Sequence, residues 1–266
     1  MSRSVELPDG ARIAYADSGG AALPVVFLHA FPVHSAMWAP QVEALAGRHR
    51  CITFDVRGFG GSSAGSLPLT IDRMADDLGA LLDALAIERA VLVGLSMGGY
   101  AALAALRRHR DRIAALLLAD TRAAADSDEA RAKRATLIAL AREEGSEAVA
   151  AKQVVGLLGK TTRRRDPELV ERVERMMAEA SPESIVAGAE ALRDRPDATP
   201  LLPSIDVPVL LLCGEEDVIT PADEMRAVAD AIPGARLELL PEAGHLSNLE
   251  NPAAFTEALR RFLASI

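Results

Sequence analysis

The chain has 266 residues, of which 50% are hydrophobic, and its formal net charge at pH 7 is −9. This length and composition allow one large core, and the acidic balance argues against nucleic acid or anionic lipid as a partner. Cys51 and Cys213 lie in apolar strand-like runs, so we expect reduced, packed thiols. No apolar run approaches the roughly 20 residues that span a bilayer. "MSRSVELPDG" has no secretory h-region, which predicts a cytoplasmic protein.

Strand-like and helix-like segments alternate along most of the chain. Short apolar runs bounded by turn residues predict strands within 12–20, 24–32, 51–60, 90–96, 113–121, 207–217 and 235–245. Helical periodicity predicts helices within 37–47, 71–86, 98–109, 221–232 and 251–266. Buried strands that alternate with helices indicate an α/β fold with a mostly parallel sheet and helices on both faces.

The alternation breaks once, between residues 121 and 200, where the pattern is helical and no strand-like run occurs. An all-helical insertion at this point predicts a cap over the carboxyl edge of the sheet, where α/β sheets bind their ligands. We therefore expect a core formed by 1–120 and 201–266 and a cap formed by 121–200. Within the cap, "GKTTRRRDP" (159–167) is interpreted as a solvated loop, with contact to an acidic partner or substrate as the alternative.

"GLSMGG" (94–99) places one serine, Ser96, between an apolar run and a helix-like segment. Two interpretations are open: a helix cap, or the nucleophile of a G-x-S-x-G turn formed by Gly94, Ser96 and Gly98. Gly94 and Gly98 favour the nucleophile interpretation, because a strained strand-to-helix turn leaves no room for side chains at these two positions. A serine nucleophile also needs a base and an acid, so the rest of the chain must supply them.

His245 is the favoured base, because it follows the last strand-like run and precedes the final helix. Structural roles are expected for the other four histidines, which are His29, His34, His49 and His109.

Three carboxylates that could orient the base follow "VPVLLLCG": Glu215, Glu216 and Asp217. Asp217 lies deepest in the loop and is preferred over the glutamates, while Asp120, at the end of the preceding strand, is a weaker alternative. The chain order serine, aspartate, histidine, with each residue just beyond a different strand, is typical of the nucleophile elbow of α/β-hydrolases.

The chain resembles the α/β-hydrolase superfamily over nearly its whole length. The resemblance rests on "HAFP" (29–32), "DVRGFGGS" (55–62), "GLSMGG", "GEEDVITP" (214–221) and "EAGHLSNLENP" (242–252). It implies an α/β-hydrolase fold with a mostly parallel eight-stranded sheet, helices on both faces and a helical cap. It also implies a catalytic triad and an oxyanion hole formed by the backbone N–H groups of Phe31 and Met97. The family usually has glycine at position 30, and the methyl group of Ala30 is expected to narrow the pocket mouth.

Within the superfamily, a serine nucleophile is typical of acyl transfer and not of the aspartate-dependent epoxide hydrolases and haloalkane dehalogenases. The chain is most similar to bacterial carboxylesterases and 3-oxoadipate enol-lactonases. This similarity implies hydrolysis of a small ester or lactone. No metal-ligand pattern is present, so neither a metal nor a cofactor is expected. Trp38 is a candidate for lining the pocket or for packing beneath it.

Two alternatives stay open: a cofactor-free haloperoxidase or perhydrolase, and a hydrolase-fold receptor for a small molecule. The oligomeric state cannot be read from the sequence. "DVRGFGGSS" is not interpreted as a phosphate loop, because no helix follows it. Asp55 and Arg57 within it are expected to fix loops by hydrogen bonds.

Overall fold

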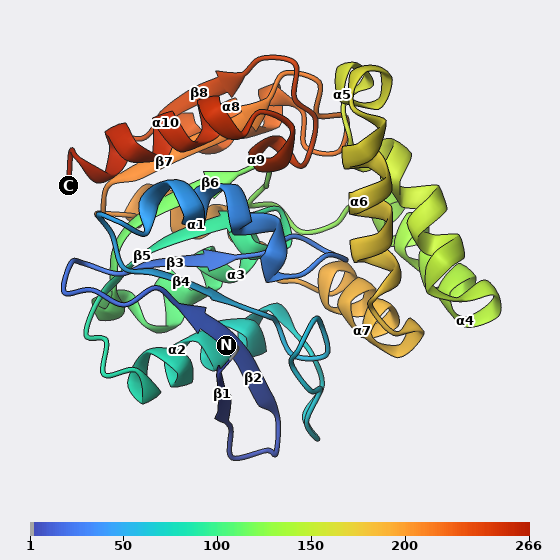
Figure 1. Ribbon diagram of the computed structural model, residues 1–266, viewed down its shortest axis with the longest axis horizontal. Coiled ribbons are helices and arrows are strands. Elements are labelled where there is room, and N and C mark those ends of the chain that lie inside the picture. Colours follow the sequence, from blue (N-terminus) through green and yellow to red (C-terminus); the bar gives the residue numbers. More distant parts are fainter. Residues whose placement is uncertain (1–2) are drawn as a thin grey trace.

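Within residues 3–266, which the computed structural model describes, the strands form one eight-stranded sheet in the order β1-β2-β4-β3-β5-β6-β7-β8 (Figure 1). The strands are β1 (Arg3–Glu6), β2 (Arg12–Asp17), β3 (Val25–Leu28), β4 (Cys51–Phe54), β5 (Ala90–Leu95), β6 (Ile113–Ala119), β7 (Val209–Gly214) and β8 (Arg236–Leu240). β1 and β2 pair antiparallel with each other and β2 with β4, and all other pairs are parallel. The mostly parallel α/β sheet expected from the sequence is confirmed.

Helices cover both faces of this sheet. α2, α3 and α8 pack on one face, and α1 and α10 on the other. Alternate residues of β5 show why both faces are apolar: Leu92 joins the cluster under α2 and α3, whereas Val91 and Val93 join the cluster under α10. The bounds are α1 (Ala39–Leu45), α2 (Ile71–Ala84), α3 (Met97–Arg108), α8 (Ala222–Ala231), α9 (Ser247–Glu250) and α10 (Pro252–Leu263).

Four helices lie between β6 and β7, and in this part of the described chain no strand interrupts them. They are α4 (Asp128–Leu157), α5 (Lys160–Arg165), α6 (Pro167–Ala178) and α7 (Pro182–Arg193). They gather at one end of the sheet, at the right of Figure 1. The division into a core and a cap at residues 121 and 200 stays a prediction.

Two local features differ from the sequence expectations. β1 was not among the predicted strands, because three of its four residues are polar and exposed at the sheet edge and Val5 is its single apolar residue. The charge run at 159–167 is not a loop but contains α5, where Arg165 pairs with Glu242 at 2.8 Å. Cys51 and Cys213 are free and buried, as expected. None of the helices among residues 3–266 combines the length and the apolar character that crossing a membrane requires.

Arg57 lies at the centre of a buried ion cluster beneath the loop after β4. Its Nε and Nη2 donate to the two carboxylate oxygens of Asp77 in α2 at 2.7 Å each, and its Nη1 donates to Asp9 at 2.7 Å. Asp55 in the same loop accepts the N–H groups of Ser35 and Gly61 at 2.8 and 2.9 Å. The loop-fixing roles expected for Asp55 and Arg57 agree with these contacts.

Arg57→Met is expected to lower the free energy of unfolding by about 3–5 kcal/mol, because it leaves the buried Asp77 carboxylate without its partner. Arg12→Met is the matched control at an exposed position of β2, with an expected change of about 0.5 kcal/mol or less. Urea unfolding followed by circular dichroism measures both. Equal effects of the two substitutions would show that the cluster adds no stability.

Candidate active site

Ser96 lies at the turn between β5 and α3 with φ 53° and ψ −112°. Its N–H donates to the Ala119 carbonyl of β6 at 2.9 Å, and its carbonyl accepts the Thr121 hydroxyl at 2.8 Å. Its hydroxyl makes no capping hydrogen bond to the first turn of α3, so the helix-cap interpretation of this serine is wrong. A non-glycine residue with positive φ just beyond a strand is the kind of strained position found at active sites.

β5, α3 and β3 lie so close together that positions 94, 98 and 99 have no room for a Cβ atom. A Cβ atom on Gly94 would overlap the carbonyl of Gly98, and a Cβ on Gly98 would overlap the carbonyl of Leu28. A Cβ on Gly99 would lie 2.5 Å from the hydroxyl oxygen of Thr121. The clash expected at Gly94 and Gly98 from the sequence is therefore confirmed.

Asp217 and His245 meet from the loops that follow β7 and β8. Asp217 Oδ2 lies 2.8 Å from His245 Nδ1, and both side chains are buried. Burial acts to raise the pKa of Asp217, but His245 and the hydrogen bonds from Thr220 outweigh it and hold the pKa at about 2. Because the carboxylate is ionised at neutral pH, Nδ1 of a neutral His245 carries the proton and Nε2 keeps a lone pair.

The two glutamates of the β7 loop have other environments. Glu216 accepts the N–H and the hydroxyl of Thr161, at the start of α5, at 2.8 and 2.6 Å. Glu215 is exposed. Among the three candidate carboxylates, the described structure brings Asp217 to His245.

The backbone N–H groups of Phe31 and Met97 lie in the loop after β3 and at the first residue of α3. Neither is hydrogen-bonded within residues 3–266, and Met97 sits where a helix leaves its N–H groups unpaired. His29 fixes the loop, because its Nε2 accepts the Val56 N–H at 2.9 Å and its Nδ1 lies 2.8 Å from the Ala30 carbonyl. Burial lowers the pKa of His29, which fits a neutral, structural ring.

Ala30 and Trp38 pack into the apolar cluster beneath this loop, and neither lines the pocket next to the candidate nucleophile. Ala30 is fully buried, with its N–H 3.3 Å from Met37 Sδ, so its methyl group does not narrow the pocket mouth as expected. The Trp38 ring lies 5.2 Å from that of Phe27 and 5.8 Å from that of Phe255, between centroids. Of the two roles considered for Trp38, the structure supports packing.

Two of the other histidines also have structural partners. His34 accepts the Ala36 N–H at 3.4 Å and lies 3.1 Å from Glu179, which follows α6. His109, at the end of α3, lies 3.3 Å from Asp76 of α2.

Ser96 and His245 line one pocket of about 480 Å³, together with Phe31 and Tyr100 of the core. Helix α4 forms a further wall through Ala130, Lys133, Arg134, Leu137, Gln153 and Leu157. The pocket therefore has a wall of mixed apolar and polar side chains, next to a serine, a histidine and two free N–H donors. Such a constellation suits attack on a carbonyl group.

A family model described as the alpha/beta hydrolase fold matches residues 24–252. The chain belongs to this family of hydrolases. The hydrolase is 32% identical over 246 residues to 3-oxoadipate enol-lactonase 2 of Acinetobacter baylyi, which is 92% of this chain and 90% of the relative. A thermophilic esterase structure from Thermogutta terrifontis matches with 39% identity and a TM-score of 0.94, over 100% of this chain and 98% of that one. A putative non-heme bromoperoxidase of Mycobacterium tuberculosis is 31% identical over 272 residues, 96% and 98% of the two chains.

Glu250 ties the helical segment of this hydrolase to the histidine loop, and sequence reasoning missed it. Its carboxylate accepts the Gly159 N–H at 2.7 Å and the Gly244 N–H at 2.9 Å. The carbonyl of Leu157 accepts the His245 N–H at 3.1 Å. Burial raises the pKa of Glu250, and the surrounding N–H groups oppose that rise. Its place five residues after His245 was a weak signal, since a glutamate ending a short helix is usually exposed.

Asp120, the weaker alternative acid, bonds to the end of β7 and to the segment that follows β8 in this hydrolase. It accepts the Gly214 N–H at 2.8 Å and the Ser247 hydroxyl. Burial, followed by the charge of Asp217, raises the pKa of Asp120 well above its usual value. Ligand atoms of Asp120, Cys213 and Asp217 lie within 4.8 Å of one another. Burial also raises the pKa of the Cys213 thiol, so this set suits hydrogen bonding better than metal ligation.

Asp217→Asn is expected to lower kcat by about 10³-fold or more, because an amide no longer fixes the His245 tautomer. Glu215→Gln and Glu216→Gln are the matched controls, with expected changes within about threefold. Steady-state hydrolysis of p-nitrophenyl acetate measures all three. An active Asp217→Asn beside an inactive Asp120→Asn would show that the acid is assigned to the wrong carboxylate.

Proposed function

We propose that this protein is a serine hydrolase that cleaves a small carboxylic ester or lactone through an acyl-serine intermediate. One observation carries the proposal: His245, which is hydrogen-bonded to Asp217, lines the same pocket as Ser96, whose hydroxyl caps no helix. In this mechanism His245 Nε2 accepts the proton of Ser96 Oγ as the oxygen attacks the carbonyl carbon. The N–H groups of Phe31 and Met97 then stabilise the oxyanion.

The second half of the reaction uses the same residues. His245 gives its proton to the leaving alkoxide, then removes a proton from water as the water attacks the acyl-serine. As the second oxyanion collapses, His245 gives this proton to Ser96 Oγ, which releases the acid and restores the serine and the neutral histidine. The similarity to an esterase and an enol-lactonase supports a small ester or lactone as the substrate. The mechanism requires no metal or cofactor.

The proposal includes residues 121–200 as a cap that shapes the substrate pocket. Support comes from α4, because Leu137 and Leu157 line the pocket that contains Ser96. Apolar cap residues elsewhere on α4 and on α6, such as Val154 and Met177, are buried but do not line this pocket among the described residues. The cap therefore divides into side chains that contact substrate and side chains that hold its helices together.

Similarity to a putative bromoperoxidase favours perhydrolysis as a second candidate function. In that reaction hydrogen peroxide, instead of water, attacks the acyl-serine and gives a peracid. Bromination of monochlorodimedone in the presence of acetate, hydrogen peroxide and bromide, compared with ester hydrolysis by the same preparation, separates the two activities, because the peracid oxidises bromide to the brominating species. A receptor with this fold would release at most one stoichiometric burst of product, whereas an esterase turns over.

Ser96→Ala is expected to abolish turnover of p-nitrophenyl esters and simple lactones while the thermal midpoint changes little. The substitution removes the nucleophile, which should lower kcat by roughly 10⁴-fold or more, and the serine hydroxyl makes no capping bond. A screen over esters of increasing acyl length and several lactones measures activity, and a thermal melt checks folding. Retention of more than about a tenth of kcat would rule out Ser96 as the nucleophile.

Leu137→Ala is expected to change acyl-length preference more than stability, because it enlarges the pocket that substrate occupies. The ratio of kcat/KM for hexanoyl and acetyl esters should shift by about 10-fold, as expected for one or two methylene groups. Met177→Ala is the matched control: it should lower stability by about 2–5 kcal/mol and leave the ratio unchanged. The opposite pattern would show that α4 does not form the substrate wall.

A further inference from the structure

The backbone of His245 is held by two acceptors that come from different parts of the chain. The carbonyl of Leu157, the last residue of α4, accepts the N–H groups of His245 and Leu246 at 3.1 and 3.2 Å. Oε1 of Glu250 accepts the N–H groups on either side of His245, from Gly244 at 2.9 Å and from Leu246 at 3.2 Å. Three consecutive N–H groups around the histidine therefore depend on one carboxylate and on one helix end.

The two carboxylate oxygens of Glu250 have separate partners. Oε1 bonds to the backbone around His245, whereas Oε2 accepts the N–H of Gly159 at 2.7 Å, in the link between α4 and α5. A Cβ atom on Gly159 would lie 2.9 Å from the backbone nitrogen of Gly244 and 3.1 Å from Glu250 Oε2. The link and the histidine backbone are therefore in close contact, and one side chain bonds to both.

This carboxylate can affect the chemistry only through His245. Among residues 3–266, Glu250 does not line the pocket that contains Ser96 and His245. A displacement of residues 244–246 would move the His245 ring, whose Nδ1 lies 2.8 Å from Asp217 Oδ2. Misplacing a reacting group by about 1 Å can lower a rate roughly 100-fold. Loss of the Glu250 bonds is therefore expected to disturb the ring without removing any group from the pocket.

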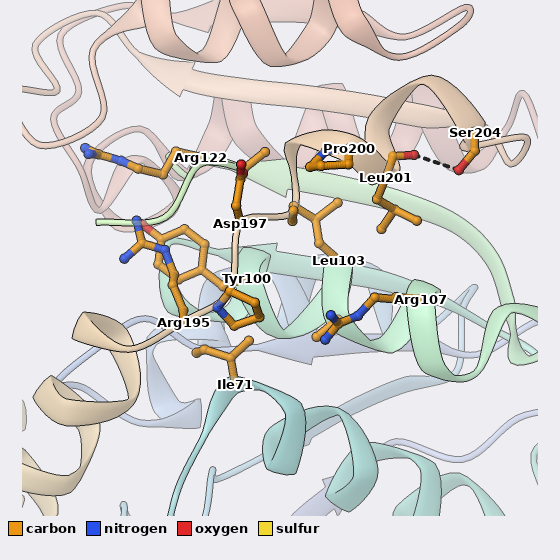
Figure 2. Close-up of a pocket in the computed structure, with 14 residues that line it drawn as sticks. Ile71, Tyr100, Leu103, Arg107, Arg122, Arg195, Asp197, Pro200, Leu201 and Ser204 are labelled. Atoms are coloured by element: carbon orange, nitrogen blue, oxygen red, sulfur yellow. Dashed lines mark hydrogen bonds between the residues drawn. The ribbon is translucent and has the colours of Figure 1, made fainter. Parts of the chain in front are cut away.

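The two ends of the helical segment are held at another place, which does not involve the histidine. The Arg195 guanidinium lies 4.4 Å from the centre of the Tyr100 ring and bonds to the Asp126 carboxylate. Figure 2 shows Arg195 beside the Tyr100 ring, at the wall of a separate cavity. All three residues lie outside the loop that contains His245. A substitution of Arg195 can therefore loosen the helical segment without removing a bond of Glu250.

We propose that Glu250 is a positioning residue, which holds the His245 ring in place against Asp217 and toward Ser96. It acts through the backbone on either side of the histidine and contacts no substrate. Because the same carboxylate bonds to the link between α4 and α5, the helical segment and the histidine are held in one arrangement. The consequence for ester hydrolysis rests on the proposed function, whereas the position of the ring does not.

Glu250→Gln removes this arrangement with little change in side-chain size. The new side chain has one acceptor oxygen and one NH2 group, so it cannot accept from both segments, whichever way the amide turns. Glu216→Gln is the matched control, because Glu216 bonds to the start of α5 and not to residues 244–246. Arg195→Met is a second control, which loosens the ends of the helical segment.

NMR of protein with isotope-labelled histidine rings measures the effect without any need for turnover. The two ring-nitrogen signals of His245 are those that disappear in His245→Gln. In the wild type, Nδ1 is expected to carry the proton and to bond to Asp217. Glu250→Gln should shift both signals, because the ring moves relative to Asp217. Glu216→Gln and Arg195→Met should leave them at their wild-type positions.

Steady-state hydrolysis of p-nitrophenyl acetate measures the consequence for the reaction. Glu250→Gln should lower kcat by roughly 10- to 100-fold and change KM by less than about twofold, because no pocket-lining group is lost. Glu216→Gln should keep kcat within about threefold of the wild-type value.

A thermal melt checks that each variant is folded. If Glu250→Gln does not fold, Glu250→Asp replaces it, since this variant keeps the charge but is too short to bond to both segments. Unchanged His245 signals in a folded Glu250 variant would overturn the proposal, as would an equal shift in Glu216→Gln or Arg195→Met. An unchanged kcat of that variant in an active protein would also overturn it. Shifted signals in a protein that hydrolyses no ester would support the positioning role and contradict the proposed function, so the two failures are distinguishable.

Discussion

The candidate site depends on the close contact of three backbone segments at Ser96. β5 enters the turn, α3 leaves it, and the end of β3 lies against both, at distances that only glycine permits at positions 94 and 98. The Ala119 carbonyl of β6 accepts the Ser96 N–H, and the hydroxyl of Thr121, just after β6, donates to the Ser96 carbonyl, so both hold the turn from the other side. This packing fixes a serine in a strained conformation at the carboxyl edge of the sheet, and the loops after β3, β7 and β8 converge on that point.

The loops after β7 and β8, which carry Asp217 and His245, also hold the helical segment. Glu216 lies next to Asp217 and bonds to the start of α5, while Glu250 follows His245 and bonds to the Gly159 N–H. A Cβ atom on Gly244 would overlap the backbone nitrogen of Gly159, so the two segments touch backbone to backbone. The position of the helical segment and the position of the histidine are therefore coupled.

Much of this arrangement could be predicted from the sequence, because the motifs that predict it are local. Each of Ser96, Asp217 and His245 follows an apolar strand in an order typical of the family, and the structure brings the latter two together. The sequence did not reveal Glu250, whose partner Gly159 is 91 residues away. It also left open whether Trp38 lines the pocket or packs beneath it, because this residue ends a 3-10 helix of four residues, which is too short to show a periodic apolar face. β1 was missed because an edge strand can be polar on both faces.

Under the proposed function, the residues that carry the chemistry and the residues that contact substrate are held in different ways. The core turn, the Asp217–His245 pair and the Gly159–Gly244 contact tolerate little change, because each is limited by backbone packing or by a buried hydrogen bond. The α4 side chains that line the pocket are held by side-chain contacts instead: Leu137 and Leu157 are buried, and Arg134 pairs with Asp126. Under the proposed function, changes to these α4 side chains would alter substrate preference without altering the core turn, in keeping with relatives that are named as an esterase, an enol-lactonase and a putative bromoperoxidase.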